Sequence, residues 1–346
     1  MRVSQENLTH TGYRTVEVAK HIHQIPTPTP FYVGAINTYL IEDEPLTLVD
    51  SGLKTEEAEE ALRAGLKELG FAFSDIEQII ITHSHLDHYG LMATIASEGN
   101  PRVCAHPLEV FDLQNPRGYA NEDDERYHRT ERFLLKSGLP KELLENILMR
   151  HPIFEQLRDP ITVTQMVNDG DVIRLKHREL RVVHCPGHSP GLINLYDSAA
   201  RVLLSGDNLL KHISPVPLIN FPKDSSQPRA HSLADYLATL RRLKTLDVDI
   251  VLTGHGEIIH DMNEIIDSIV VHHEVRKRKV HRFLDGSPKT AYDVCSHLFP
   301  KIEAYHIYLG MSEAVGHLDI LQTEGAVEME ERNGKFLYHS KGAPRH

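Results

Sequence analysis

The chain has 346 residues, of which 40% are hydrophobic and 25% are charged. This balance is typical of a protein with a packed core and excludes an intrinsically disordered chain. The net charge of −12 argues against a protein whose whole surface binds nucleic acid, although it leaves a local basic patch open. The length fits one large domain or two domains of ordinary size.

The sequence contains no obvious targeting or membrane segment. No apolar run approaches the roughly 20 residues that a membrane helix needs. The polar N-terminal segment lacks the apolar stretch of a secretory signal. We therefore expect a cytoplasmic protein with no membrane partner. The three cysteines, Cys104, Cys185 and Cys295, are too few and too scattered for a disulfide framework, so we expect buried thiols.

In the first part of the chain, short apolar runs alternate with a helical hydrophobic period. Strands are predicted at 15–25, 35–41, 46–49, 76–82 and 102–105. Helices are predicted at 55–69, which Gly70 ends, and at 89–97. The run Ile79–Ile81 is typical of a buried strand.

Residues 107–158 differ, because they are rich in charge and in Glu/Leu periodicity, and they read as a helical insertion. Strands then return at 161–167, 171–175, 180–185, 192–196 and 202–205, followed by an amphipathic helix at 232–243 and a strand at 250–253. Two successive halves, each with strands before helices, favour an α/β fold with a four-layer αββα sandwich over a simple doubly wound sheet.

The last part of the chain is predicted to be a separate small α+β domain. From about residue 262 it is helical, with a later helix around 312–321. Two alternating segments, 326–330 and 335–339, flank the hairpin signal Arg332-Asn333-Gly334. Helices followed by a two-stranded ribbon are the layout of a winged helix. We therefore expect a catalytic domain at 1–262 and a winged-helix-like domain at 263–346.

The clearest functional signal is Thr82-His83-Ser84-His85-Leu86-Asp87-His88, directly after a predicted strand. His83 and His85 are two residues apart, so near a strand end they point the same way. Asp87 and His88 lie where the next helix begins and can turn toward the same pocket. Imidazoles and a carboxylate are suitable ligands for Zn²⁺ and related ions.

Three later segments repeat one pattern, in which a strand ends and a polar residue follows a glycine. They are Pro186-Gly187-His188, Gly206-Asp207 and Gly254-His255-Gly256. The glycines let the backbone turn sharply, so that the side chain projects from the end of the strand. Each segment is a weak signal by itself. Together with the first motif, and in this order, they form a strong one.

This series of motifs resembles that of the metallo-β-lactamase superfamily, over roughly residues 15–260. Leu48-Val49-Asp50-Ser51-Gly52 also resembles an early strand end of that family. The resemblance implies the αββα sandwich, and it is part of the reason for preferring that fold. It also implies two metal ions, the first held by His83, His85 and His188, the second by Asp87, His88 and His255, with Asp207 bridging them. Asp50 then orients a ligand, or is a plain turn residue.

The resemblance further implies a hydrolase that binds two Zn²⁺ per chain, with iron or manganese as alternatives. Two such ions share a hydroxide and polarise a carbonyl or phosphoryl oxygen, so no serine or cysteine nucleophile is needed. Asp87 is the candidate catalytic residue, as the acceptor of a proton from the attacking water. A subset of the superfamily resembles persulfide dioxygenases with a single iron, so a mononuclear oxidoreductase is an alternative.

The substrate is less constrained by the sequence. The chain resembles the glyoxalase II-like and beta-lactamase-like protein 2 groups, which makes a small-molecule acyl or thioester substrate the leading expectation. Lys211, His212 and Lys223 are candidates for binding an anionic group. The alternative is a phosphodiesterase or endoribonuclease, for which the basic stretch Arg276–Arg282 is the best evidence. A solvated helix face explains that stretch equally simply. The oligomeric state stays open, with a homodimer as one alternative.

Overall fold

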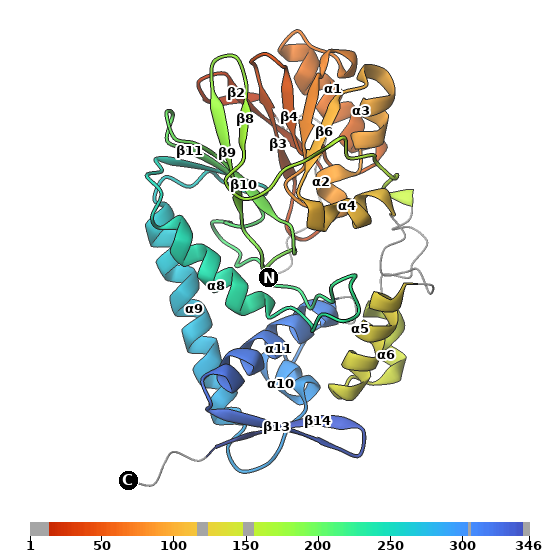
Figure 1. The fold of residues 1–346 in the computed structure, drawn as a ribbon, viewed down its shortest axis with the longest axis vertical. Coiled ribbons are helices and arrows are strands. Elements are labelled where there is room, and N and C mark those ends of the chain that lie inside the picture. Colours follow the sequence, from red (N-terminus) through yellow and green to blue (C-terminus); the bar gives the residue numbers. More distant parts are fainter. Residues whose placement is uncertain (1–13, 116–123, 148–155, 304–305, 342–346) are drawn as a thin grey trace.

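A computed structural model of the chain describes residues 14–115, 124–147, 156–303 and 306–341. Its upper half in Figure 1 contains two β-sheets, and its lower half is mainly helical with one hairpin. In this part of the chain, no helix is both long and apolar enough to span a bilayer. The three cysteines are free and buried, as expected.

The first sheet has seven strands in the order β1-β2-β3-β4-β5-β6-β7. Their bounds are β1 Val16–Ala19, β2 Ile22–Thr27, β3 Ile36–Ile41, β4 Thr47–Val49, β5 Gln78–Ile80, β6 Arg102–Ala105 and β7 Gln165–Met166. The second sheet has five strands in the order β12-β11-β10-β9-β8. Their bounds are β8 Val172–Arg174, β9 Glu179–His184, β10 Ile193–Asp197, β11 Val202–Gly206 and β12 Ile250–Thr253.

Apolar side chains from both sheets form the central core, among them Tyr39, Ile80, Leu195 and Leu204. The outer face of the first sheet packs on α1 (Glu56–Glu68) and α3 (Met92–Gly99), with the short helix η1 (Phe73–Asp75) beside them. The outer face of the second sheet packs on α8 (Ser232–Leu243) and α9 (Met262–Phe283). This is the four-layer αββα sandwich that the sequence predicted.

Three predicted elements differ from those observed. The strand expected at 15–25 is the hairpin β1–β2, because the chain turns at His21, whose φ is +57°. The helix expected at 89–97 is α3, which the short helix α2 (Leu86–Tyr89) precedes. Gly90 separates these helices, where a Cβ would collide with the backbone of Lys54 and Leu157. The strand expected at 161–167 pairs only as β7.

Residues 107–158 contain the helices α4 (Pro107–Gln114), α5 (Glu125–Lys136) and α6 (Lys141–Ile147). The apolar side chains of α5 and α6 pack against the C-terminal helices rather than against the sandwich. Tyr127 and Leu134 share a core with Val280, Met311 and Leu318. α5 and α6 therefore lie against the C-terminal part of the chain, as Figure 1 also shows at the lower right, whereas α4 packs on the sandwich through Leu113.

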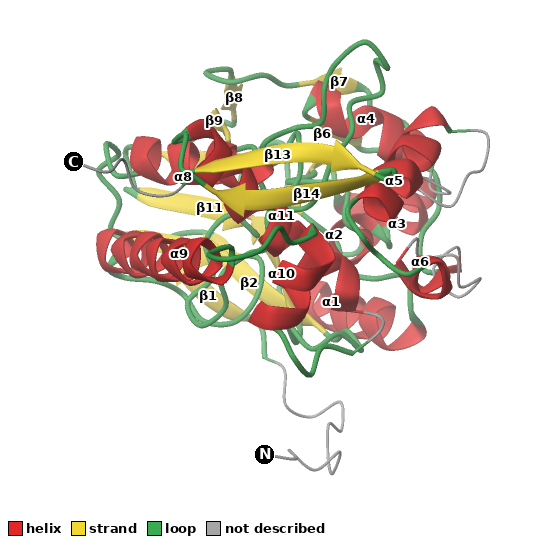
Figure 2. Cartoon of the chain, turned by 90° about the horizontal axis from the view of Figure 1, so that it is seen from below, coloured by secondary structure: helices red, strands yellow, loops and turns green. Residues whose placement is uncertain are grey.

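The C-terminal part continues from α9 into α10 (Ala291–Leu298), α11 (Ile307–Thr323) and the strands β13 (Val327–Arg332) and β14 (Lys335–Ser340). Asn333 and Gly334 form the tight turn of the hairpin, with φ of +53° and +74°. Figure 2 shows the hairpin lying across α10 and α11. The predicted order of helices and hairpin is thus observed, whereas the winged-helix assignment and the boundary at 262/263 stay predictions.

Candidate metal centre

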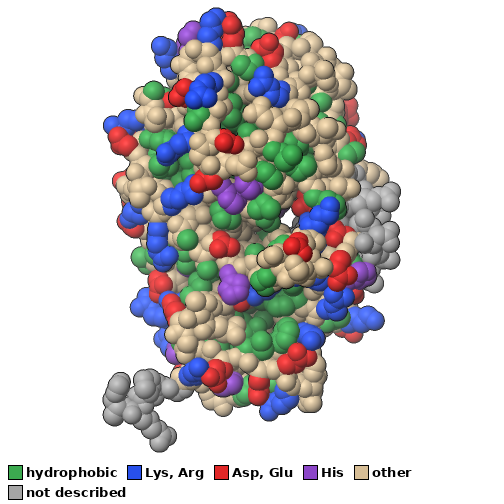
Figure 3. Space-filling view, viewed as in Figure 1, with side chains coloured by type: hydrophobic (Ala, Val, Ile, Leu, Met, Phe, Trp, Pro, Cys, Tyr) green, Lys and Arg blue, Asp and Glu red, His purple; other side chains and the backbone are tan. Residues whose placement is uncertain are grey.

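The seven predicted ligands follow the ends of strands in both sheets. His83 and His85 come just after β5, and Asp87 and His88 lie in α2. His188 follows β9, Asp207 follows β11, and His255 follows β12. Segments that are far apart in the chain therefore meet at one edge of the sandwich. Figure 3 shows the molecule hollowed midway along this face, with histidine side chains exposed beside the hollow.

The ligand atoms of these residues form three overlapping groups, and within each group the atoms lie no more than 4.8 Å apart. One group contains His83, His85 and His188, and another contains Asp87, His88 and His255. Asp207 lies between them, grouped with His83 and His88. The structure thus brings all seven candidate ligands together, whereas their division between two ions with Asp207 as the bridge stays a prediction. Which ions these residues bind stays a prediction.

Asp50 organises one side of the centre. It lies at the end of β4 with φ of +59°, a left-handed conformation that aspartate tolerates better than most residues. Its carboxylate accepts hydrogen bonds from the Thr82 amide at 2.9 Å, the Thr82 hydroxyl at 2.7 Å and Nδ1 of His88 at 2.8 Å. His83 Nδ1 in turn lies 3.1 Å from the Thr82 hydroxyl oxygen. Asp50 therefore orients a candidate ligand, one of its two expected roles.

Backbone carbonyls orient two further histidines. His188 Nδ1 donates to the carbonyl of Val216 at 3.1 Å, and His255 Nδ1 donates to the carbonyl of Ala35 at 2.9 Å. A neutral imidazole that donates from Nδ1 carries its lone pair on Nε2. Both rings therefore present Nε2 toward the centre, in the way that outer hydrogen bonds hold metal-binding histidines in place.

The inner atoms of the centre lack the partners that buried polar atoms normally have. Nε2 of His83, His88 and His255 and Oδ1 of Asp207 are buried without a hydrogen-bond partner. His188 Nε2 faces His85 Nδ1 at 2.9 Å. Unpartnered nitrogens and a carboxylate oxygen that converge on one place fit cations held between them, because a cation accepts all of these lone pairs at once.

Burial and neighbouring charges set the protonation states. Burial lowers the pKa of His83 well below its usual value and that of His85 to about 3, so both imidazoles are neutral near pH 7. Burial raises the pKa of the Asp207 carboxyl, but His255 and His88 outweigh it and hold that pKa well below its usual range. These three side chains are therefore in the forms that bind metals. At His88 and His255 burial lowers the pKa, but the neighbouring aspartates outweigh it and raise the pKa, so these two imidazoles release a proton when a cation binds.

Comparisons with known proteins agree with this geometry. The family model described as "Metallo-beta-lactamase superfamily" matches residues 31–255. The chain belongs to this superfamily. "Probable metallo-hydrolase YqjP" of Bacillus subtilis is 34% identical over 309 residues, which are 88% of this chain and 92% of that protein. This chain is therefore a metallo-hydrolase of the superfamily, and we expect it to require metal ions.

Two further similarities concern the fold and one local region. The crystal structure of a metallo-beta-lactamase family protein from Thermus thermophilus superimposes with a TM-score of 0.78 at 30% identity, covering 94% of this chain and all of that one. Human "Acyl-coenzyme A thioesterase MBLAC2" is 36% identical over 96 residues, 27% of this chain and 31% of that protein. The first similarity extends over the C-terminal part as well, whereas the second is local.

Glu109, in α4, is a residue of this metallo-hydrolase that the sequence did not reveal. Its carboxylate is 1% exposed and accepts hydrogen bonds from the amide and hydroxyl of Ser84, the former at 2.9 Å. It also accepts from the hydroxyl of Ser189 at 2.8 Å and from the amide of Gly191 at 2.5 Å. Glu109 thus ties the segment that carries His83 and His85 to the segment that carries His188.

Gly254 shows why a glycine precedes His255. A Cβ at this position would collide with Oδ1 of Asp207 and with the His88 ring. The backbone at the end of β12 therefore runs directly against the candidate ligands, and only glycine allows that approach.

Of the three residues predicted to bind an anionic group, two contact a residue close to His255 in the chain. Lys211 and His212 both contact the carboxylate of Glu257, two residues after His255. The third, Lys223, lies elsewhere, with its ammonium nitrogen 4.0 Å from the ring centroid of Phe111.

In the basic stretch Arg276–Arg282, Arg276 pairs with Glu313, and Lys277 pairs with Glu274 and Glu324. Part of that stretch is therefore neutralised by the protein itself.

Proposed function

We propose that this metallo-hydrolase cleaves an ester-type bond, and specifically a thioester, with two zinc ions bound by the seven residues of the centre. The observation on which the proposal depends is the convergence of buried nitrogens and a carboxylate oxygen without hydrogen-bond partners. When bound, zinc supplies Lewis acidity toward a carbonyl oxygen and lowers the pKa of water to near 7. The proposed partner is a small acyl or thioester molecule.

The chain's own residues have distinct roles in this proposal. His83, His85 and His188 would hold one ion, Asp87, His88 and His255 would hold the other, and Asp207 would serve as a ligand of both. Asp87 also accepts the proton of the attacking water at Oδ2, which lies 3.3 Å from His255 Nε2. Asp50, Glu109 and the carbonyls of Ala35 and Val216 keep the donors aimed inward, so that little reorganisation is needed when substrate binds.

The thioester assignment has narrower support than the metal centre. It is favoured by the local similarity to a protein named as an acyl-coenzyme A thioesterase. An endoribonuclease is less favoured, because the net charge of the chain is −12 and Lys277 of the basic stretch already pairs with both Glu274 and Glu324. Ion pairs of this kind weaken a claim to phosphate binding, since the cations are partly neutralised before nucleic acid arrives.

A substrate panel with parallel metal analysis tests the proposal. S-lactoylglutathione, an acyl-coenzyme A, single-stranded RNA and glutathione persulfide would each be offered to the purified full chain, with zinc and iron measured per chain. We expect thioester hydrolysis, about two zinc ions per chain and no oxygen consumption. Cleaved RNA beside intact thioesters would overturn the substrate assignment. Oxygen uptake with persulfide and one iron per chain would overturn the hydrolytic assignment of the centre.

A further inference from the structure

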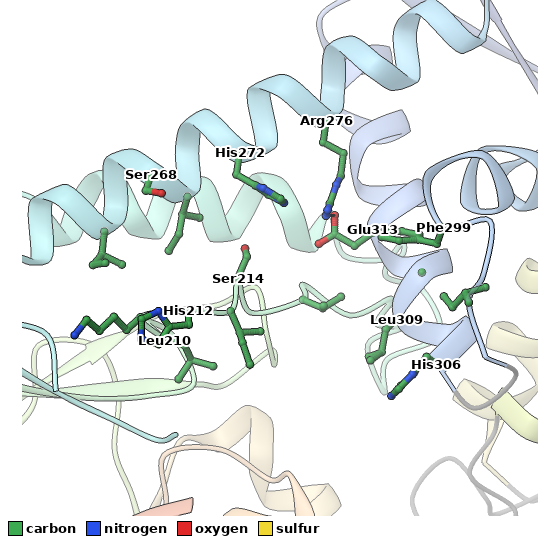
Figure 4. Close-up of a pocket in the computed structure, with 17 residues that line it drawn as sticks. Leu210, His212, Ser214, Ser268, His272, Arg276, Phe299, His306, Leu309 and Glu313 are labelled. Carbon is green, nitrogen blue, oxygen red and sulfur yellow. Dashed lines mark hydrogen bonds and ion pairs between the residues drawn. The ribbon is translucent and has the colours of Figure 1, made fainter. Parts of the chain in front are cut away.

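A cavity of about 500 Å³ lies between α9, α11 and the loop that follows Asp207. Figure 4 shows its walls: Ser268, His272 and Arg276 project from α9, Leu309 and Glu313 from α11, and Leu210, His212 and Ser214 from the loop. We refer to it as the α9–α11 pocket. Its volume suits a small organic molecule, and its lining comes from both the sandwich and the C-terminal part of the chain.

The pocket is a direct neighbour of the metal centre. Leu210 and Val216 line it, and Val216 provides the carbonyl that orients His188 at 3.1 Å. Lys211 at its edge contacts Glu257, which follows His255 by two residues. The loops that hold the candidate ligands therefore also form one wall of the pocket. The pocket therefore adjoins the centre through this shared loop.

The lining combines apolar walls with several polar and basic side chains. The apolar part consists of Leu210, Ile213, Val216, Ile265, Ile269, Phe299, Ile302 and Leu309. The titratable side chains are Lys211, His212, His272, Arg276 and His306, against the single carboxylate of Glu313. Lys211 and His212 both contact Glu257, so Arg276 is the cation of the lining with the most donors left for a ligand. A ligand that suits such walls has a carbon chain and an anionic group.

Arg276 is the best-placed cation in the pocket. Its Nη1 group donates to Oε2 of Glu313 at 2.8 Å, and its guanidinium lies 5.2 Å from the centroid of the Phe299 ring. Glu313 is only 4% exposed, whereas the Arg276 side chain is 22% exposed. An arginine has five N–H donors, and the pairing with Glu313 engages one end of the fork. The remaining donors are available to a carboxylate or phosphate oxygen.

A buried hydrogen-bond series fixes Glu313 from behind. His317 Nδ1 donates to the backbone carbonyl of Glu313 at 2.7 Å. His273 Nδ1 then donates to His317 Nε2 at 3.4 Å, and the Ser214 hydroxyl donates to His273 Nε2 at 3.2 Å. We call His273, Glu313 and His317 the α9–α11 cluster. It connects both helices to the loop after Asp207 through Ser214, His273, His317 and the backbone carbonyl of Glu313.

We propose that the α9–α11 pocket binds the anionic end of the substrate, a carboxylate or phosphate group held by Arg276, with the adjoining carbon chain against the apolar walls. This inference rests on the proposed thioester hydrolysis, because it names the class of thioester. The anionic group belongs either to the acyl chain or to the thiol carrier. Both sources present the same oxygens to the guanidinium, so the experiment separates them.

Steady-state kinetics of the full chain on three thioesters tests the pocket. S-hexanoyl-N-acetylcysteamine is neutral, S-adipoyl-N-acetylcysteamine carries a carboxylate on its acyl chain, and hexanoyl-coenzyme A carries phosphates on its thiol carrier. Arg276→Gln is expected to raise KM about tenfold or more for the anionic substrate that uses the pocket, the size of one lost charge-assisted hydrogen bond. KM for the neutral thioester and all kcat values stay within about twofold by the same reasoning.

Matched variants separate charge recognition from a structural effect. Arg278→Gln removes an exposed arginine of the same helix outside the pocket, and it should leave all three KM values unchanged. Arg276→Lys should restore part of the loss. Should Arg276→Gln fold poorly, Ser268→Asp places a negative charge in the same pocket and should raise KM for the same anionic substrate.

The outcomes distinguish this inference from the function on which it rests. Equal kcat/KM of the unaltered chain for all three thioesters, or equal changes in KM on Arg276→Gln, would overturn the pocket assignment and leave thioester hydrolysis standing. Failure to hydrolyse any of the three, with RNA cleaved instead, would remove both. The anionic substrate whose KM rises identifies the source of the charge.

Discussion

Two groups of buried histidines and carboxylates lie in the described part of this molecule, and each places three donor atoms within 4.8 Å of one another. One is the metal centre, and the other is the α9–α11 cluster of His273, Glu313 and His317. In the cluster these side chains are 2%, 4% and 0% exposed, so it is as buried as the centre. Residue types and proximity alone would identify both as metal sites.

Hydrogen bonding distinguishes the two groups. At the centre, Nε2 of His83, His88 and His255 is buried without a partner. In the cluster, His273 and His317 are linked to each other, to Ser214 and to the Glu313 carbonyl. Among the described residues, no polar atom of the cluster is both buried and without a partner.

The comparison teaches that a metal site is recognised by buried donor atoms whose lone pairs accept no hydrogen bond, and not by the residue types alone. An imidazole nitrogen that accepts a hydrogen bond has no lone pair to offer a cation unless that bond breaks. Glu313 is in addition already neutralised by Arg276 at 2.8 Å. We therefore expect metal at the centre and a purely structural role for the cluster, and the predictions below test each half of this contrast.

The largest effect is expected at the shared carboxylate of the centre. Asp207 Oδ1 lies 3.4 Å from His88 Nε2, and its Oδ2 lies 3.7 Å from Nε2 of both His188 and His255. Asp207→Ala should lower kcat/KM for the substrate at least about 10³-fold, because the ligand common to both ions and their charge balance are lost. Kinetics and metal analysis of the purified variant measure this.

Asp235→Ala, an exposed aspartate on α8, is the control for Asp207→Ala and should retain both activity and metal. Unchanged turnover in Asp207→Ala would remove this residue from the mechanism. Unchanged metal content with lost turnover would instead limit Asp207 to the chemical step.

A smaller effect is expected from Glu109, which contacts the segments on both sides of the centre without offering an oxygen to it. Glu109→Gln keeps the shape of the side chain, but it replaces one carboxylate oxygen with an NH₂ group. That group then faces the donors of Ser84, or those of Ser189 and Gly191, which the oxygen accepted. Metal affinity should fall about 10- to 100-fold, as is usual when residues behind the ligands are changed. Competition with a coloured chelator measures the affinity without any substrate.

Glu60→Gln, on the exposed face of α1, is the matched control and should leave the affinity unchanged. An unaltered affinity in Glu109→Gln, together with a lowered melting temperature, would show that Glu109 stabilises the fold without positioning the ligands. The difference in hydrogen bonding between the centre and the cluster would then depend on the candidate ligands alone, and not on Glu109.

Much of the centre was predictable because its residues follow strands whose apolar runs are continuous in the sequence. The predicted bounds of β6, β12 and α8 coincide with those observed. β11 and β12 are neighbours in the second sheet, and Thr82, just after β5 of the first sheet, lies against Gly206 at the end of β11, so the polar residues that follow these strands converge. Local pattern and overall fold agree here, and local pattern is what a sequence displays.

Glu109 could not be predicted in the same way. Its partners Ser84 and Ser189 are 25 and 80 residues away, and nothing near Glu109 in the sequence differs from an ordinary polar helix position. The ion pairs of the basic stretch could not be predicted for a related reason. Glu313 and Glu324, which pair with Arg276 and Lys277, are 37 and 47 residues away. Pairing between distant segments is a property of packing, which residue patterns do not encode locally.

The smallest effect, and the sharpest test of the contrast, is expected in the cluster. His317→Leu removes the acceptor that faces His273 Nδ1 at 3.4 Å and leaves that N–H buried and unpaired. The free energy of unfolding should fall by about 1–3 kcal/mol, the cost of one unsatisfied buried group. The metal content should stay that of the unaltered chain. Urea denaturation and metal analysis of the same sample measure both, and loss of one metal equivalent would make the cluster a metal site after all.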